Sequence, residues 1–516
     1  MNKVLKGLVA VAATAAMAIA GVAGAASATA DEATYTITVN NTKSGHAYEA
    51  YQVFSGTLSN DTLSDIQWGT GVNEEGKTHF GNAAAKAKSL TDTNVARAFA
   101  KEVSNYLSSD KATSTENKTA DGQTESYTIS NLTAGYYFVK DTTVTGDDSH
   151  TSYIMKVVKN TTATPKSVQP TVDKKVKDEV ADKDVTADEK GWGNTADHAI
   201  NESFQFKLTA TIPADTNLSD YKTYQVKFND TMSKGVTFEK IDSVKVNNSD
   251  VTAADYTLSS NVAEGLKGKA TWDLTIADIT KLAGVNLATT ETTVEVIYSA
   301  HLNEEAQVNK ASGDTTNANS VNLEYSNNPN GEGFGKTADK TVYVFTYEVD
   351  NTKVKGNAQG ESTGNPLQNA GFRLYSDQAT STEVKLIYDE TLSAYRPVKG
   401  SETAQEMKSA ENGKFNIVGL DAGTYYLKET TTPAGYNTAP LTTVTIVANH
   451  QLDDNAAPKV DLTLSKGMNN TIVDVPGSDL PETGGMGTTI LYAAGAAIVL
   501  VAAFGIAFAV RRRNAR

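Results

Sequence analysis

Residues 420–429 read LDAGTYYLKE, and residues 132–141 read LTAGYYFVKD. In both copies a glycine-containing turn precedes a tyrosine-rich run that fits a half-buried β-strand. Each run ends in an acid, Glu429 in one copy and Asp141 in the other. The repeat predicts one β-module design that the chain uses twice.

The sequence between and around these copies is also typical of strands. The runs YTITV (35–39), FQFKL (204–208) and VEV (294–296) alternate with a period of two. Such alternation places one face of each strand in a core. We therefore predict a mainly β protein built from tandem immunoglobulin-like β-sandwich modules.

One stretch has helical spacing instead. Apolar residues recur at Val95, Phe99, Val103 and Leu107. Asp92 or Thr93 can cap the N-terminus of this helix. An amphipathic helix of this kind packs on a sheet, so we expect the N-terminal module to be decorated by one helix.

Composition limits the function further. The chain has 516 residues, enough for several domains, with 46 Lys+Arg against 61 Asp+Glu and no cysteine. The net charge of −15 argues against a nucleic-acid partner, which needs a basic face. The lack of cysteine excludes disulfides, thiolate metal sites and a cysteine nucleophile.

The N-terminal 30 residues predict a secretory signal peptide. Lys3 and Lys6 precede an Ala-rich apolar run that ends in small residues, with cleavage after Ala28 or Ala30. A membrane anchor is the alternative interpretation of this run. At the other end, residues 490–510 carry no charge and are long enough to span a bilayer.

The C-terminal 37 residues resemble the sorting signal that sortases read in Gram-positive bacteria. The apolar span is followed by arginines and preceded by the pentapeptide Leu480, Pro481, Glu482, Thr483 and Gly484. The resemblance implies cleavage between Thr483 and Gly484 and attachment of Thr483 to an acceptor amine.

Linkers near residues 164–170 and 328–331 divide the rest of the chain. We therefore expect the domains 1–30, 31–165, 166–332, 333–479 and 480–516.

The C-terminal module resembles the B-type collagen-adhesin domains of major shaft pilins from sortase-assembled pili. YLKET at 426–430, followed by Pro433, Gly435 and Tyr436, is similar to the E-box of that family. The resemblance implies that Glu429 drives an isopeptide bond between a lysine on the first strand and an Asn or Asp on the last. We expect Lys353 to be the lysine and Asp474 its partner, with Asn470 as the substitute.

The chemistry has its own physical requirements. A lysine attacks only as the neutral amine, so burial must lower its pKa, while a buried carboxyl stays protonated and can shuttle protons. Close packing supplies the effective concentration.

The middle module is similar to the A-type domain of the same family. Lys174 shares its strand face with Val172 and Val176, so it is expected to point inward. The segment FNDT at 228–231 resembles the one that supplies the catalytic aspartate, which gives Asp230. Parity on the last strand allows either Asn319 or Asn327 as the partner of Lys174.

The first module lacks a first-strand lysine in an apolar frame, since Lys43 lies in a turn. We predict no isopeptide bond there. In the linker, Lys166 follows Pro165, and the resemblance implies that this lysine accepts the threonyl group of the next subunit. A proline at this position keeps the backbone extended and accessible.

We therefore expect a structural pilus subunit, exported and anchored to the cell wall, that supports adhesion. Its partners would be pilus-specific and housekeeping sortases, further copies of itself, accessory tip or basal pilins and peptidoglycan. A monomeric wall-anchored adhesin is the alternative function. The six histidines lack metal-ligand spacing and residues 178–189 favour a solvated loop over a calcium site, so we expect no metal, no cofactor and no substrate-turnover activity.

Overall fold

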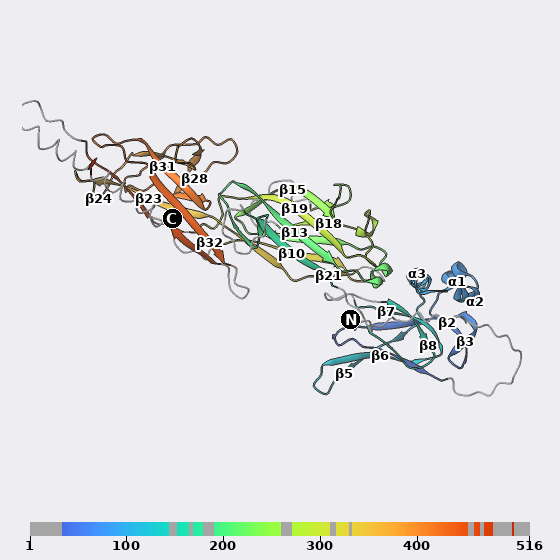
Figure 1. Ribbon diagram of the computed structural model, residues 1–516. Helices are drawn as coiled ribbons and strands as arrows, with labels where there is room; N and C mark the ends of the chain where they lie inside the picture. Colours follow the sequence, from blue (N-terminus) through green and yellow to red (C-terminus); the bar gives the residue numbers. More distant parts are fainter. Residues whose placement is uncertain are drawn as a thin grey trace, which may run out of the picture.

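The computed structural model describes residues 33–143, 152–164, 169–178, 190–259, 271–309, 316–329, 333–451, 459–464, 469–477 and 498–499. Figure 1 shows three β-rich modules following one another along the chain, each with two sheets. The mainly β, multi-module architecture that the sequence predicts is confirmed.

The first module packs the sheet β5-β6-β1-β9 against the sheet β3-β2-β7-β8, with β4 added to β2. Tyr127 and Ile129 belong to one core cluster and Phe54 and Phe138 to a second, beneath the helices. Its elements are β1 (Tyr35–Val39), β2 (Tyr48–Ser59), β3 (Thr62–Trp68), α1 (Glu74–Phe80), α2 (Ala83–Ser89), α3 (Thr93–Val103), β4 (Ala112–Thr113), β5 (Thr115–Lys118), β6 (Thr124–Leu132), β7 (Gly135–Asp141), β8 (Ser152–Val157) and β9 (Thr161–Ala163).

The predicted helix exists as α3, where the Asp92 carboxylate accepts a hydrogen bond from the backbone N–H of Val95 at 3.0 Å. Its apolar face is narrower than predicted, because Val95 is 39% exposed while Phe99 stacks on Phe54. Two short helices, α1 and α2, were not predicted. They begin at the asparagine caps Asn73 and Asn82.

The middle module packs the sheet β11-β10-β13-β19-β15-β16 against β12-β22-β20-β14-β18-β17, with β21 added to β20. Its elements are β10 (Thr171–Lys177), β11 (Trp192–Gly193), β12 (Thr195–Asp197), β13 (Ser203–Ile212), η1 (Thr216–Asp220), β14 (Val226–Met232), β15 (Val236–Val246), β16 (Ser249–Asp250), β17 (Thr257–Leu258), β18 (Thr271–Ile276), η3 (Ile279–Lys281), β19 (Thr292–Leu302), β20 (Asn317–Ser326), β21 (Phe334–Lys336) and β22 (Lys340–Phe345).

The C-terminal module packs β24-β23-β30-β28-β27, with β34 added to β23, against β26-β25-β31-β32-β33, with β29 added to β25. Its elements are β23 (Tyr347–Gly356), β24 (Ser362–Pro366), β25 (Gly371–Tyr375), β26 (Glu383–Val384), β27 (Leu386–Asp389), β28 (Ala394–Pro397), β29 (Met407–Lys408), β30 (Ile417–Leu420), β31 (Gly423–Thr431), β32 (Thr442–Gln451), β33 (Lys459–Leu464) and β34 (Asn469–Asp474).

The join between the last two modules lies later than residue 332, where the sequence placed it. Strand β22 pairs with β20 and β12, so it belongs to the middle module. The apolar run that begins at Val342 therefore changes sheets near Thr346, between β22 and β23.

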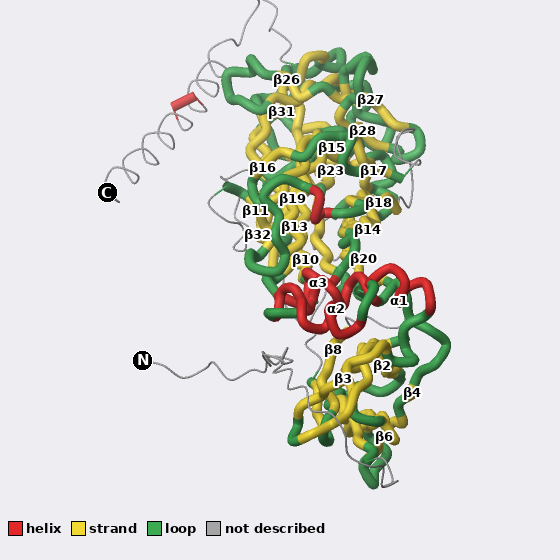
Figure 2. The backbone as a smooth tube through the Cα atoms, turned by 90° about the vertical axis from the view of Figure 1, so that its right-hand side faces the viewer, coloured by secondary structure: helices red, strands yellow, loops and turns green. Residues whose placement is uncertain are grey.

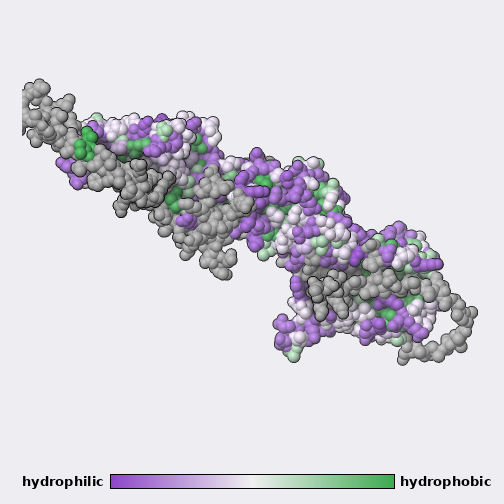
Figure 3. All heavy atoms as spheres, in the orientation of Figure 1, coloured by the Kyte–Doolittle hydropathy of each residue, from purple (hydrophilic) through white to green (hydrophobic). Residues whose placement is uncertain are grey.

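The helices of the first module lie beside the middle module (Figure 2). Arg97 on α3 donates a hydrogen bond to the carbonyl of Thr216 at 2.9 Å and pairs with Asp220 at 3.4 Å. Hydrophilic side chains cover most of the described surface visible in Figure 3. Among the described residues no helix is long and apolar enough to cross a bilayer, and the predicted span at 490–510 lies almost wholly outside them.

Candidate functional site

Lys174 is buried at the centre of the middle module. The alternation of β10 turns Val172, Lys174 and Val176 to the core, and Lys174 is only 1% exposed. Phe206 lies beneath its ammonium group, with the ring centroid 5.2 Å from Nζ. An amine in such a position has lost almost all its hydration, so it needs polar partners.

Those partners come from three other strands. Lys174 Nζ contacts the carboxylate of Asp230 on β14 and donates a hydrogen bond to Asn319 Oδ1 on β20 at 2.6 Å. Tyr298 on β19 completes the cluster, because its hydroxyl donates to Asp230 Oδ2 at 3.1 Å and accepts from Asn319 Nδ2 at 2.6 Å. All four side chains are buried. The cluster connects β10 and β19, which lie in one sheet, to β14 and β20, which lie in the other.

The two candidate partners of Lys174 are now distinguishable. Asn319 lies against Lys174, at the end of β20 that pairs with Met232. Asn327 is also buried, but it follows the opposite end of β20 and its backbone N–H donates to the carbonyl of Gly333 at 3.1 Å. Of the two, only Asn319 has its amide group within reach of the amine.

Electrostatics in this cluster favour neutral groups. Burial lowers the pKa of Lys174 to about 8, even though Asp230 opposes the shift. Burial also raises the pKa of Asp230 above its usual value, and raises that of Tyr298 well above 10. Both shifts favour a neutral amine beside a protonated carboxyl, compared with the same groups in water.

Lys353 occupies the corresponding place in the C-terminal module. It is fully buried on β23, and its Nζ contacts the carboxylate of Asp474 on β34. Glu429 on β31, in the opposite sheet, places Oε2 3.5 Å from the same nitrogen. The ring of Phe372 lies 5.3 Å from it.

Asn470 does not reach this cluster. In the parallel pairing of β23 with β34, Asn470 lies opposite Asn351 and donates a hydrogen bond to its Oδ1 at 3.1 Å. Asp474 is therefore the residue beside the amine. Burial raises the pKa of Glu429, and the nearby Asp474 raises it further. The backbone N–H of Ala439, which donates to Oε2 at 2.5 Å, lowers this pKa and so opposes the shift.

The first module has a different pair at the end of its tyrosine-rich strand. Asp141, the counterpart of Glu429 in the repeat, is buried and lies 2.6 Å from His46 Nδ1. Lys43 remains in an exposed turn. The absence of an isopeptide bond in this module stays a prediction.

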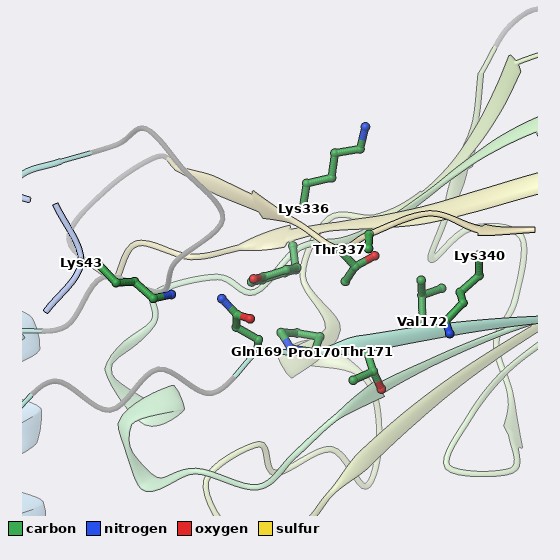
Figure 4. A pocket seen from close by; sticks show the side chains of 10 residues that line it. Lys43, Gln169, Pro170, Thr171, Val172, Lys336, Thr337 and Lys340 are labelled. Carbon is green, nitrogen blue, oxygen red and sulfur yellow. The ribbon is translucent and has the colours of Figure 1, made fainter. Parts of the chain in front are cut away.

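Lys166, the sorting residues 480–484, and the signal peptide lie outside the described residues. The described residues begin again at Gln169, which lines a pocket of about 560 Å³ between the first and middle modules. Figure 4 shows Lys43 reaching toward Gln169, with Lys336 and Lys340 on the other side. The pocket next to the linker is therefore rich in lysine.

Sequence reasoning did not identify Tyr298. The signal was available, since Tyr298 continues the inward parity of Val294 and Val296 on β19. A tyrosine among core valines predicts burial, but its contact with Asp230 depends on how the two sheets face each other.

Comparisons with known proteins agree with this architecture. Residues 200–329 match the model of the Gram-positive pilin backbone subunit 2, Cna-B-like domain, and residues 352–458 match the SpaA prealbumin-like fold domain. Residues 200–329 are therefore similar to a domain of Gram-positive pilin backbone subunits. The match over residues 200–329 describes the middle module as Cna-B-like, whereas the sequence resemblance implied an A-type domain.

Similar solved structures include major pilins. The full-length SpaD pilin of Corynebacterium diphtheriae is 18% identical, with a TM-score of 0.45, over 86% of this chain and 98% of that one. The T6 backbone pilin of Streptococcus pyogenes is 15% identical, with a TM-score of 0.47, over 87% and 100% of the two chains. No curated protein sequence matches the chain.

Proposed function

We propose that this chain is the shaft subunit of a covalently polymerised pilus on the cell surface. The observation that carries the proposal is the pair of buried clusters, Lys174–Asp230–Asn319 and Lys353–Glu429–Asp474. The first cluster lies in the module that matches the Gram-positive pilin backbone domain model, and the second lies in the module that matches the SpaA prealbumin-like fold domain. A fibre subunit under tension is the kind of protein that benefits from such internal cross-links.

The geometry suits amide formation in both modules. In the middle module the neutral Lys174 amine attacks Cγ of Asn319, the new N–C bond replaces the Cγ–Nδ2 bond, and Asp230 carries the proton to the departing ammonia. In the C-terminal module Lys353 attacks Cγ of Asp474, and Glu429 assists the loss of water. The acids act as general acid–base groups held at contact distance.

The consequence is mechanical. Each bond ties the first strand of a module, β10 or β23, to one near its end, β20 or β34. Load entering at one end then passes through covalent bonds rather than through strand hydrogen bonds, each worth about 1 kcal/mol net.

Head-to-tail joining uses the C-terminal sorting signal and the linker between the first and middle modules. A sortase cleaves after Thr483 and transfers its carbonyl to the amine of Lys166 in a neighbouring subunit, and the last subunit is attached to peptidoglycan. The lysine-lined pocket beside the linker supports this assignment. Its positive charge attracts the neighbour's C-terminal segment, which contains Asp479 and Glu482.

The experiment that tests polymerisation compares Lys166→Ala with Lys159→Ala in the native host. Lys159 is an exposed lysine near the same linker, so its replacement controls for general effects of charge loss. Cell-wall extracts of the Lys166 variant should lose the ladder of high-mass polymers while the control keeps it. An unchanged ladder in the Lys166 variant would favour the monomeric adhesin.

A further inference from the structure

The join between the middle and C-terminal modules brings a second polar cluster together. His198 follows β12, and its backbone N–H donates to the carbonyl of Phe345 at 3.0 Å. The backbone N–H of Ile200 then donates to the carbonyl of Gly419 at 2.9 Å, on strand β30, which ends just before Asp421. A Cβ at Gly419 would lie 2.5 Å from Ile200, so the two modules approach as closely as side chains allow.

Carboxylates from both modules meet at this join. Asp178 and Asp197 are buried, and Glu202 is partly exposed, all from the middle module. Asp421, from the C-terminal module, is also partly exposed.

His198 directs an unused nitrogen into the same cluster. Its ring stacks on Phe204, with centroids 4.1 Å apart, and the residue is only 4% exposed. Nε2 lies 2.8 Å from the carbonyl oxygen of Lys177, which can only accept, so the ring proton of the neutral imidazole belongs on Nε2. Nδ1 makes no hydrogen bond and faces Glu202 Oε1 at 3.9 Å.

This arrangement has the features of a metal-binding histidine. A ligating imidazole donates its other N–H to a carbonyl or carboxylate, which orients the ring and leaves a lone pair for the metal. Ligand atoms of His198, Glu202 and Asp421 all lie within 4.8 Å of one another. A lone pair that faces carboxylates requires a positive charge between them.

We propose that His198, Glu202 and Asp421 bind a divalent transition-metal ion such as Zn²⁺ at the join between the middle and C-terminal modules. One imidazole nitrogen with two carboxylate oxygens suits zinc, whereas Ca²⁺ prefers six to eight oxygen ligands. The ligands come from two modules, so the ion bridges them. Binding would restrain the bending of one module against the next.

The site is tested on residues 31–483, purified without a histidine tag and stripped with a chelator. Isothermal titration with Zn²⁺ and, separately, with Ca²⁺ should show one Zn²⁺ per chain and at least 100-fold weaker Ca²⁺. Glu202→Gln and Asp421→Asn, which keep side-chain shape, should each weaken Zn²⁺ binding at least tenfold. His301→Ala is the matched control, since His301 also pairs with a glutamate but belongs to no such cluster among the described residues.

Two further readouts separate ligation from folding. Asp421→Asn removes a half-buried acid, so its metal-free thermal midpoint should equal or exceed that of the parent chain. Co²⁺ should give a visible absorption band that His198→Ala abolishes. Zinc binding that is absent in the parent chain, or unchanged in both isosteric variants, would overturn the site and leave a proton as the bridging charge. Neither result bears on polymerisation through Lys166.

Discussion

Lys353 on β23 and Asp474 on β34 meet in the core of the C-terminal module although 121 residues separate them in the chain. The parallel pairing of these strands and the approach of Glu429 from the opposite sheet bring the three groups together. A covalent bond between the first two closes almost the whole module into one loop. Loss of this bond should therefore destabilise the entire module.

Glu429→Gln should prevent the Lys353–Asp474 bond, because the amide cannot transfer the proton that leaves with water. The intact mass should rise by one water beyond the change due to the substitution. By loop-closure entropy the module should lose about 4–5 kcal/mol of unfolding free energy.

Glu406→Gln is the control for that variant. Glu406 accepts hydrogen bonds from Thr430 and Thr431, just past Glu429 on the same strand, but does not belong to the Lys353 cluster. Equal masses and equal stabilities for the two variants, after correction for the substitutions, would remove the catalytic role of Glu429.

The choice between the two asparagines gives a second prediction. Asn319→Ala should keep the ammonia equivalent that the parent chain loses, and Asn327→Ala should still lose it, because only Asn319 has its amide beside Lys174. Peptide mapping should find Lys174 joined to Asn319. A cross-linked peptide that contains Asn327 would contradict the assignment.

The Asn319→Ala variant should also show a distinct pH dependence. Its free Lys174 has a folded-state pKa of about 8, below the ordinary value near 10.4. The unfolded chain then binds more protons between these values, so the free energy of unfolding should rise from pH 8 to pH 10 by up to about 1.4 kcal/mol per pH unit.

Asn327→Ala serves as the reference for that measurement, because the proposed bond would leave its Lys174 as an amide that cannot titrate. Urea unfolding at pH 8 and pH 10 gives the free energy of unfolding of both variants. Surface groups contribute equally to the two variants, so their contributions cancel in the difference. Parallel stabilities between pH 8 and pH 10 would show that Lys174 is not buried as a free amine.

The pocket beside the linker gives a prediction for assembly. Lys336→Glu combined with Lys340→Glu should slow polymer formation, since reversed charge repels the acidic C-terminal segment of the neighbour. Lys245→Glu, outside the pocket, is the control. Polymer yield per cell at low ionic strength checks this, and equal yields for both variants would exclude docking in the pocket.

Much of the candidate site follows from local pattern. Period-two alternation turns Lys174 and Lys353 inward. The YLKET motif contains Glu429, which is buried on β31. Parity could not separate Asn319 from Asn327, since both face the core. Their separation along β20 matters only once the register with β14 is known.

Other features depend on how distant segments pack. His198 and Asp421 lie in different modules, so no sequence spacing relates them. The run from Val342 to Val354 contains no glycine or proline that would mark a break, and it divides into β22 and β23 because successive parts pair with different sheets. The short helices α1 and α2 have few periodic apolar residues, so their local signals were the asparagine caps and, in α2, a run of Ala and Lys.

The most direct test of the central proposal is the intact mass of residues 31–483 purified under denaturing conditions. Two internal amide bonds predict a mass below the calculated value by one ammonia and one water, with Lys174 joined to Asn319 and Lys353 joined to Asp474. Agreement with the full calculated mass would contradict the covalently locked pilus subunit.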